Sequence, residues 1–205
     1  MIQIFAHRAV LNSKENILEG IRNCIQLNIG LEIDLRYDKD VYMSHDVNKN
    51  FQFFEEACKI FSLSKTKIAL HVKETQAIKE IIRLVNEYLI NQNCFMFMDT
   101  IGYMQLEEFV GNDLQVAYYA SHKPLSYKPT IYWCDELGDD WYNESIIDSL
   151  HKNNKILYAM SKELIHQADL DEIKKEWERL LDLGFDGICT DYPLELRSFI
   201  KERGR

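Results

Sequence analysis

Short apolar runs alternate with longer amphipathic segments along most of this chain, and this alternation constrains its fold more than any other feature. Nine runs have the length and composition of buried strands, and helical patterns separate most of them. The strand-like runs are residues 2–6, 31–36, 41–45, 67–73, 94–99, 114–120, 130–135, 155–160 and 186–191. Alternating strands and helices are typical of a parallel sheet, because parallel strands need a long crossover connection.

The helical segments carry apolar residues at spacings of three and four, which predicts amphipathic helices. The clearest stripes lie in residues 15–28, 76–90 and 169–183, and Gly30 and Gly184 follow two of them as stop signals. Weaker helices are predicted at 53–62, 102–110, 141–152 and 194–202.

The run at 41–45 follows the run at 31–36 closely enough to be the return arm of a β-hairpin. Eight strands then remain, which predicts a compact α/β protein with the (β/α)8, or TIM, barrel fold and a short β-hairpin after its second strand. The link between 114–120 and 130–135 is short for a helix, so an open doubly wound sheet is the alternative. No Pro-, Gly- or Ser-rich linker divides the sequence, and we expect residues 1–205 to form a single domain.

Composition narrows the class of partner. The net charge of the 205 residues is -9, which argues against a nucleic-acid partner, because phosphate backbones are bound by basic surfaces. No apolar run approaches the roughly 20 residues that span a bilayer, and the N-terminus lacks the pattern of a signal peptide. The five cysteines are scattered singly, as buried thiols of a reducing compartment are. We therefore expect a cytoplasmic protein without a transmembrane segment, and the oligomeric state stays open.

Polar residues gather where the predicted strands end, which is the edge of a (β/α)8 barrel that carries active sites. These residues are His7, Arg8, Glu32, Asp34, His45, His71, Lys73, Asp99, Asp135, Glu136 and Asp191. We expect the other histidines, His122, His151 and His166, on the surface, the acidic run 135–141 in a solvated loop, and Trp133 in the core.

Glu32 and Asp34 alternate around an isoleucine and therefore share one face of their strand. Two buried carboxylates need a cation, since unpaired buried charges are costly. Oxygen ligands suit a hard divalent cation such as Mg2+ or Ca2+. An internal ion-pair network with Arg8 and Lys73, without any metal, is the alternative. His7 and His45 have the side chain that most often acts as acid and base near neutral pH.

Four short motifs appear in order: Ala-His-Arg at 6–8, Glu-Asn at 15–16, Glu-Ile-Asp at 32–34 and His-Asp at 45–46. The segment 183–193, LGFDGICTDYP, closes the series. This ordered set resembles the glycerophosphodiester phosphodiesterase family, whose members carry His-Arg-Gly, Pro-Glu-Asn-Thr, Glu-x-Asp and His-Asp, and end with Gly-x-Asp-Gly-Ile-x-Thr-Asp-x-Pro.

The resemblance implies a TIM barrel that hydrolyses a glycerophosphodiester, or a related small phosphodiester, to an alcohol and glycerol 3-phosphate, in lipid metabolism and with a divalent cation. It implies His7 and His45 as the acid and base. The other implied roles are metal binding by Glu32 and Asp34, phosphate binding by Arg8 and Lys73, and support by Glu15, Asp99 and Asp191.

The sequence departs from the family pattern at several positions. Ala9 stands for the glycine after His-Arg, Ile17 stands for the threonine after Glu-Asn, and the turn glycine of the hairpin is replaced by Val41. His71 stands where the family has a glutamate that commonly completes the metal site. We count His71 as the third ligand, and because imidazole favours transition metals, Mn2+ or Zn2+ joins Mg2+ and Ca2+ as a candidate. The alternative is that Glu74 or Asp99 supplies the missing carboxylate.

These departures leave a second hypothesis from another class of function. The chain could be a catalytically degenerate barrel that binds a phosphorylated ligand without hydrolysing it. A third hypothesis is a lyase related to phospholipases, which would accumulate a cyclic phosphate.

Overall fold

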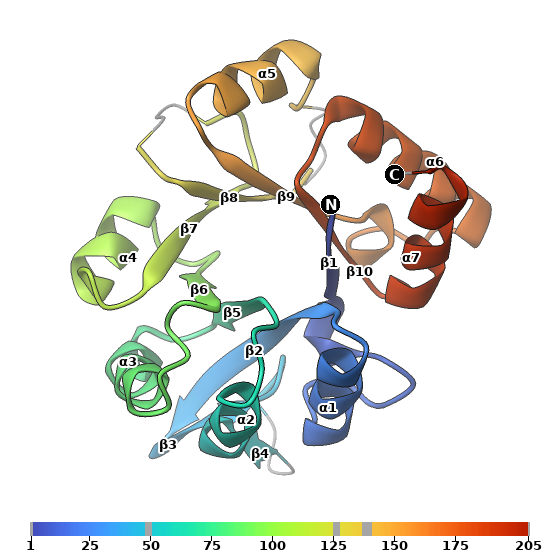
Figure 1. The fold of residues 1–205 in the computed structure, drawn as a ribbon. Helices are drawn as coiled ribbons and strands as arrows, with labels where there is room; N and C mark the ends of the chain where they lie inside the picture. The colour runs from blue at the N-terminus through green and yellow to red at the C-terminus, as the bar shows by residue number, and fades with distance from the viewer. Residues whose placement is uncertain (1, 48–50, 125–127, 137–140, 205) are drawn as a thin grey trace. The chain divides into compact units, whose positions relative to one another are not determined.

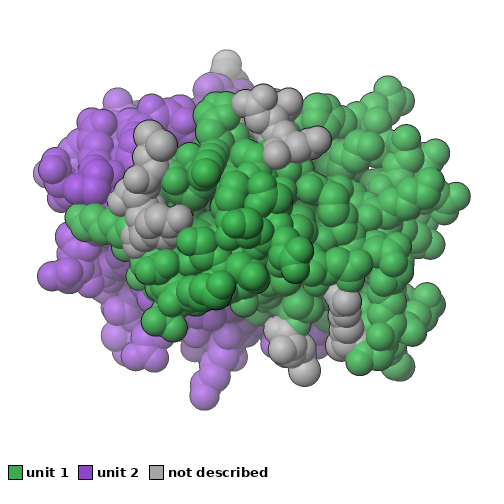
Figure 2. Space-filling model, turned by 90° about the horizontal axis from the view of Figure 1, so that it is seen from above, with its two compact units in different colours: residues 1–5, 117–205 green, residues 6–116 purple. Residues whose placement is uncertain are grey.

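The computed structural model describes residues 2–47, 51–124, 128–136 and 141–204. The chain forms two compact units, which Figure 2 distinguishes by colour. Unit 1 comprises residues 1–5 and 117–205, and unit 2 comprises residues 6–116. That the whole chain acts as a single domain stays a prediction.

Unit 2 contains a parallel core of strands to which an antiparallel hairpin is added. Strands β2 and β5, and β5 and β6, pair in parallel, whereas β3 runs antiparallel to β2 and β4 runs antiparallel to β3. The elements, in chain order, are η1 (His7–Ala9), α1 (Leu18–Gln26), β2 (Gly30–Asp38), β3 (Asp40–Met43), β4 (Gln52–Phe53), α2 (Phe54–Phe61), β5 (Ile68–Val72), η2 (Thr75–Ala77), α3 (Ile78–Glu87), β6 (Cys94–Phe97) and α4 (Tyr103–Val110).

Unit 1 is built from parallel strands and three α-helices. Strand β8 pairs in parallel with β7 and β9, and β9 pairs in parallel with β10. Strands β1 and β7 continue from one unit into the other. The elements are β1 (Gln3–Ala6), β7 (Gln115–Ala120), β8 (Ile131–Cys134), α5 (Glu144–Lys152), β9 (Ile156–Met160), η3 (Lys162–Leu164), α6 (Leu170–Leu183), β10 (Gly187–Thr190) and α7 (Pro193–Glu202).

The strand order along the sheet is β1-β10-β9-β8-β7-β6-β5-β2-β3-β4. Without the hairpin strands β3 and β4, this is the order of eight strands in a (β/α)8 barrel. In each unit the helices lie on one face of the strands (Figure 1), whereas a doubly wound sheet has helices on both faces. The fold is therefore an α/β barrel of the (β/α)8 class with a hairpin after its second parallel strand, as predicted.

The predicted helices and strands are all present, with small changes at their ends. The first helix begins at Leu18 rather than near residue 15, because the preceding residues form a loop in which Asn16 donates its backbone N–H to the Arg8 carbonyl at 2.7 Å. Strand β4 and the three short 3-10 helices were not predicted. Between β7 and β8, residues 121–124 and 128–130 form no helix, and among the described residues no helix is long and apolar enough to cross a membrane.

Parallel strands covered on both sides bury both of their faces. In β2 every residue from Gly30 to Leu35 is buried, so Glu32 and Asp34 are only 2% and 1% exposed. The core of unit 1 includes Trp133, whose ring meets the edge of Phe5 at 5.3 Å, as its predicted core position requires. All five cysteines are buried free thiols, which confirms that prediction.

Helix α1 approaches the loop after β1 unusually closely at Gly20. A Cβ atom at Gly20 would lie 2.2 Å from the backbone oxygen of Ala9 and 2.6 Å from the Ser13 hydroxyl. Only a glycine permits this approach, because a backbone carbonyl cannot rotate away as a flexible side chain can. Gly20 therefore fixes where the His7–Ala9 turn lies against α1.

We expect Gly20→Ala to lower the free energy of unfolding by about 1–3 kcal/mol, because the new methyl group overpacks the contact with Ala9. The measurement is chemical denaturation followed by circular dichroism. Gly102→Ala is the matched control, since a Cβ there meets nothing within 4 Å and the backbone has a negative φ of -67°. Equal stabilities of the two variants would contradict the close approach.

Candidate active site

Most of the predicted site residues meet in unit 2, at the carboxyl ends of its parallel strands. Strand register explains the meeting, because Asp34 on β2 lies directly opposite His71 on β5, and His71 lies opposite Phe97 on β6. Lys73 follows β5 by one residue, and Asp99 follows β6 by two. The 3-10 turn η1 adds His7 and Arg8.

Glu32 is held through only one of its two carboxylate oxygens. Its Oε2 accepts the backbone N–H of Arg8 at 2.9 Å. Its Oε1 is buried and accepts no hydrogen bond from the residues that the structure describes. The His71 Nδ1 atom lies 3.5 Å from this oxygen, which is too long for a good hydrogen bond. A buried carboxylate oxygen in this state is destabilising unless another group binds it.

Asp34 is held more completely. Asn16 donates its side-chain Nδ2 to Asp34 Oδ2 and accepts the Asp34 backbone N–H, both at 3.0 Å. The Lys73 Nζ lies 3.0 Å from Asp34 Oδ1, and the Arg8 Nε lies 3.4 Å from Oδ2. Burial favours the neutral acid, but the contact with His71, the charge of Lys73 and the Asn16 hydrogen bond hold the pKa of Asp34 well below its ordinary range.

His71 lies in the middle of this charge cluster, with its ring stacked on Phe97 at 4.5 Å. Its Nδ1 lies 3.3 Å from Asp34 Oδ1, and its Nε2 lies 3.5 Å from Asp99 Oδ2. Burial opposes protonation of the ring, but the contacts with Asp34, Asp99 and Glu32 outweigh burial and raise the pKa of His71 to about 10. The contact with His71 in turn lowers the pKa of Asp99 to about 2.

Glu32, Asp34 and His71 each offer one ligand atom, and these atoms lie within 4.8 Å of one another. Four carboxylates lie in or beside the cluster (Glu15, Glu32, Asp34 and Asp99), against the basic side chains of Arg8 and Lys73 and the protonated ring of His71. A divalent cation that displaces the His71 proton fits this surplus of negative charge and the Glu32 Oε1, which accepts no hydrogen bond from the described residues. The donor set of two carboxylates and one imidazole is acceptable to Mg2+ or Ca2+ and suits Mn2+ or Zn2+ as well.

The ion-pair network that the sequence offered as an alternative to a metal is also present. Arg8 and Lys73 both lie close to Asp34, and the Lys73 Nζ additionally approaches His71 Nδ1 at 3.0 Å. This network satisfies Asp34 but leaves Glu32 Oε1 without a hydrogen bond among the described residues. The network therefore does not satisfy Glu32 as it satisfies Asp34.

The loop after β1 gives Arg8 its orientation. Arg8 and Ala9 have φ angles of +50° and +53°, a region that non-glycine residues seldom adopt. The turn aims the Arg8 backbone N–H at Glu32, and its side chain donates from Nη1 to Glu15 Oε2 at 2.7 Å. His7, at the start of the turn, is half-buried. Glu15 is thus placed to organise this loop.

His45 follows the hairpin strand β3 and has a side chain that is 36% exposed. Its Nδ1 lies 3.0 Å from Asp46 Oδ1. Its backbone oxygen accepts a hydrogen bond from Arg36 Nε at 2.8 Å, and the same guanidinium binds Glu74 through Nη1 at 2.6 Å.

Sequence reasoning missed the contributions of Asn16 and Arg36, and it considered Glu74 only as a substitute metal ligand, whereas Glu74 binds Arg36 and the Tyr37 backbone N–H. Asn16 belongs to the Glu-Asn motif, but the motif did not indicate that Asn16 binds Asp34. Arg36 carries a usable signal, since period two places it on the same face of β2 as Glu32 and Asp34.

Asp191 lies in unit 1, where it is exposed and its backbone N–H donates to Glu163 Oε1 at 3.2 Å.

The prediction of a solvated loop at 135–141 is wrong for Asp135, which is 2% exposed and accepts a hydrogen bond from the Tyr119 hydroxyl at 2.5 Å. Residues 137–140 of that run lie outside the described residues. His122 and His166 are exposed as predicted, whereas His151 is half-buried and lies 3.2 Å from Asp186 Oδ2.

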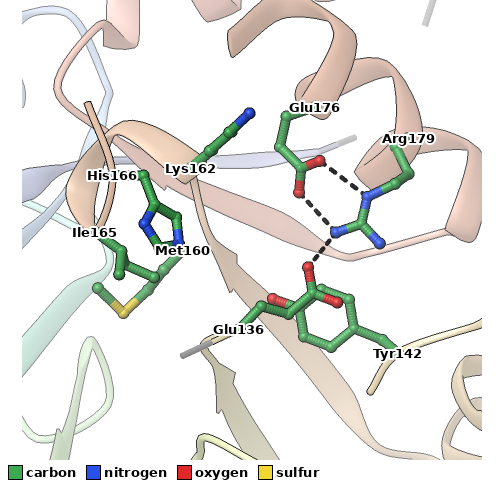
Figure 3. A pocket seen from close by; sticks show the side chains of 8 residues that line it. All are labelled: Glu136, Tyr142, Met160, Lys162, Ile165, His166, Glu176 and Arg179. Atoms are coloured by element: carbon green, nitrogen blue, oxygen red, sulfur yellow. Dashed lines mark hydrogen bonds and ion pairs between the residues drawn. The ribbon is translucent and has the colours of Figure 1, made fainter. Parts of the chain in front are cut away.

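Unit 1 has a pocket of its own with a volume of about 440 Å³. Figure 3 shows Arg179 on one side, bound to Glu136 and to both oxygens of Glu176, with Lys162 and His166 opposite. The lining residues are Glu136, Tyr142, Met160, Lys162, Ile165, His166, Glu176 and Arg179. Of these only Glu136 was noted among the polar residues at strand ends, and none was assigned a role in the predicted site.

No protein-family model matches the sequence, and no similar sequence was found among curated proteins. Solved structures do match. A glycerophosphodiester phosphodiesterase from Parabacteroides distasonis is 13% identical and has a TM-score of 0.75, with 100% of this chain and 98% of that chain covered. One from Agrobacterium tumefaciens is 13% identical and has a TM-score of 0.72, with 98% and 100% covered. At such identities the likeness shows the fold, which this chain shares along nearly its whole length with structures of glycerophosphodiester phosphodiesterases.

Proposed function

We propose that this chain is a metal-dependent phosphodiesterase of the glycerophosphodiester phosphodiesterase family. It hydrolyses a glycerophosphodiester or a related small phosphodiester to an alcohol and a phosphomonoester, which is glycerol 3-phosphate for the former. The carrying observation is the cluster of Glu32, Asp34 and His71, in which a buried carboxylate oxygen has no hydrogen bond from the described residues. The shared fold and the order of the sequence motifs support the same conclusion.

The charges of the site suit an anionic substrate. The basic side chains of Arg8 and Lys73 are 24% and 10% exposed, so both remain within reach of a phosphoryl group. Bound by Glu32, Asp34 and His71, a divalent cation would act as a Lewis acid on a phosphoryl oxygen. Arginine and lysine then hold the remaining phosphoryl charge in place.

His45 is suited to the role of general base. With its Nδ1–H donated to Asp46, the ring exposes the lone pair of Nε2, which can accept a proton. The proton comes from a water molecule or from the 2-hydroxyl of glycerol, and the second route first gives a cyclic phosphate. His7 then protonates the leaving oxygen as general acid.

The supporting roles follow from the contacts. Asp99 orients His71 from the side opposite to Asp34, and Glu15 holds the Arg8 guanidinium. We assign Asp191 a supporting role by the motif alone. We also propose that residues 1–205 act as one domain, in the cytoplasm and in lipid metabolism.

We expect turnover of bis(4-nitrophenyl) phosphate and glycerophosphocholine with Mg2+, Ca2+, Mn2+ or Zn2+, and loss of turnover in EDTA. His7→Ala or His45→Ala should lower kcat by about 10²–10⁴-fold, as the loss of a general acid or base does. His122→Ala is the control, since this histidine is exposed, lies in unit 1 and has no role in the proposed site.

Turnover that survives EDTA, or that is unchanged in His7→Ala, would overturn the proposal. Binding of a phosphate ester without metal and without turnover would favour the degenerate barrel instead. Accumulation of a cyclic product would favour the lyase.

We expect Glu32→Gln to weaken binding of the divalent cation at least about tenfold, since it removes the charge of a ligand while keeping its shape. Calorimetric titration measures the affinity directly. A thermal shift gives a second readout, because a ligand bound only by the folded state raises Tm. The exposed Glu108→Gln is the matched control. Unchanged affinity in Glu32→Gln would show that the cation binds elsewhere.

A further inference from the structure

The guanidinium of Arg36 ties three parts of unit 2 together beside the cluster of Glu32, Asp34 and His71. It extends from β2, donates from Nε to the His45 backbone oxygen at 2.8 Å, and donates from Nη1 to Glu74 Oε1 at 2.6 Å. The second oxygen of Glu74 accepts the Tyr37 backbone N–H at 2.8 Å. Glu74 thus fixes both the side chain of Arg36 and the strand that carries it.

The position of Arg36 in β2 places its side chain on the face that carries the buried carboxylates. Residues 32, 34 and 36 share one face of the strand, so Arg36 is the next side chain beyond the two buried carboxylates. Glu74 follows Lys73 just after β5, the strand that carries His71. One guanidinium therefore joins the strand of Glu32 and Asp34, the end of the strand of His71, and the residue proposed as general base.

His45 depends on such a contact, because it lies beyond the regular pairing of the hairpin. The register between β2 and β3 ends with Leu35 opposite Met43, and the next residue, Ser44, still donates its backbone N–H to the Asp34 carbonyl at 3.1 Å. Among the described residues, Arg36 bonds to the His45 carbonyl and Asp46 contacts the His45 ring. Asp46 has a side chain that is 86% exposed, so it orients the ring but does not anchor the backbone.

We propose that Arg36, held by Glu74, is a positioning residue that keeps His45 at a fixed distance from the carboxylates of β2. This inference rests on the proposed function, in which His45 is the base. The side chains of Arg36 and Glu74 are 18% and 29% exposed, so the charge-assisted bonds between them are only partly screened by water. Catalysis is sensitive to such positioning, because a displacement of about 1 Å can lower a rate by about 10²-fold.

The kinetic test compares Arg36→Ala and Glu74→Gln with the wild type. We expect Arg36→Ala to lower kcat about 10–100-fold while KM stays within about twofold, because Arg36 acts through His45 and not on the substrate. Glu74→Gln should show a smaller loss of kcat, since the amide can still accept from Arg36. Added ethylguanidinium at a non-denaturing concentration should restore part of the kcat of Arg36→Ala, which a general loss of stability would not allow.

Arg83→Ala is the matched control. Arg83 is also ion-paired to glutamates of unit 2, Glu80 and Glu87, and neither of these glutamates is a site residue. We expect wild-type kcat from this variant. If the wild type turns over substrate and Arg36→Ala has the same kcat as Arg83→Ala, the positioning role is wrong and the proposed function stands.

A spectroscopic test separates this inference from the proposed function. With 15N-labelled histidine and the His45 signal assigned from His45→Gln, we expect one Nδ1–H tautomer of His45 in the wild type. Arg36→Ala should broaden or average this signal and leave that of His122 unchanged. An unchanged His45 signal in Arg36→Ala overturns the positioning role, whether or not the enzyme turns over substrate. Absence of turnover in the wild type would refute only the proposed function.

Discussion

Two carboxylates buried on one face of β2 are the constraint on which the rest of unit 2 depends. Moving an ion out of water costs several kcal/mol even after relaxation, so Glu32 and Asp34 persist only because other groups converge on them. Asn16 satisfies Asp34 from two sides, the Arg8 backbone N–H satisfies one oxygen of Glu32, and Lys73 supplies a cation. The other Glu32 oxygen, Oε1, accepts no hydrogen bond from the described residues, and this observation supports the proposal of a bound cation.

The demand for the Arg8 N–H explains the unusual backbone beside it. Arg8 and Ala9 both adopt positive φ, at a cost of about 1–2 kcal/mol each relative to ordinary backbone. The turn is held by Glu32, which accepts the Arg8 N–H, by Glu15, which binds the Arg8 side chain, and by Gly20, which lets α1 pack against the Ala9 carbonyl. Backbone strain is thus concentrated where the chain must present a donor to a buried anion.

The apolar runs and helical stripes sufficed to predict the strands, the helices and the hairpin, because strands buried on both faces are continuous apolar runs and helices buried on one face are periodic. Period two also sufficed to place Glu32 and Asp34 together. The two residues of β4 are too short to leave such a signal. The role of Asn16 could not be assigned, because a hydrogen bond across 18 residues depends on tertiary packing rather than on local pattern. Period two gives the face of β2 on which Arg36 lies, but not its partner Glu74, which is 38 residues away in the sequence. The burial of Asp135 likewise depends on tertiary packing, because the hydroxyl that it accepts comes from Tyr119 on the neighbouring strand.

The imidazole of His71 changes the charge of the cluster as well as its donor set. A glutamate at this position would add a third carboxylate beside Glu32 and Asp34, and like charges at such distances repel strongly when buried. The ring stacks on Phe97, and the Lys73 Nζ lies 3.0 Å from both Asp34 Oδ1 and His71 Nδ1. The cluster therefore carries fewer negative charges than three carboxylates would. Under the proposed function, a divalent cation bound there would leave more positive charge for the phosphoryl group of a substrate.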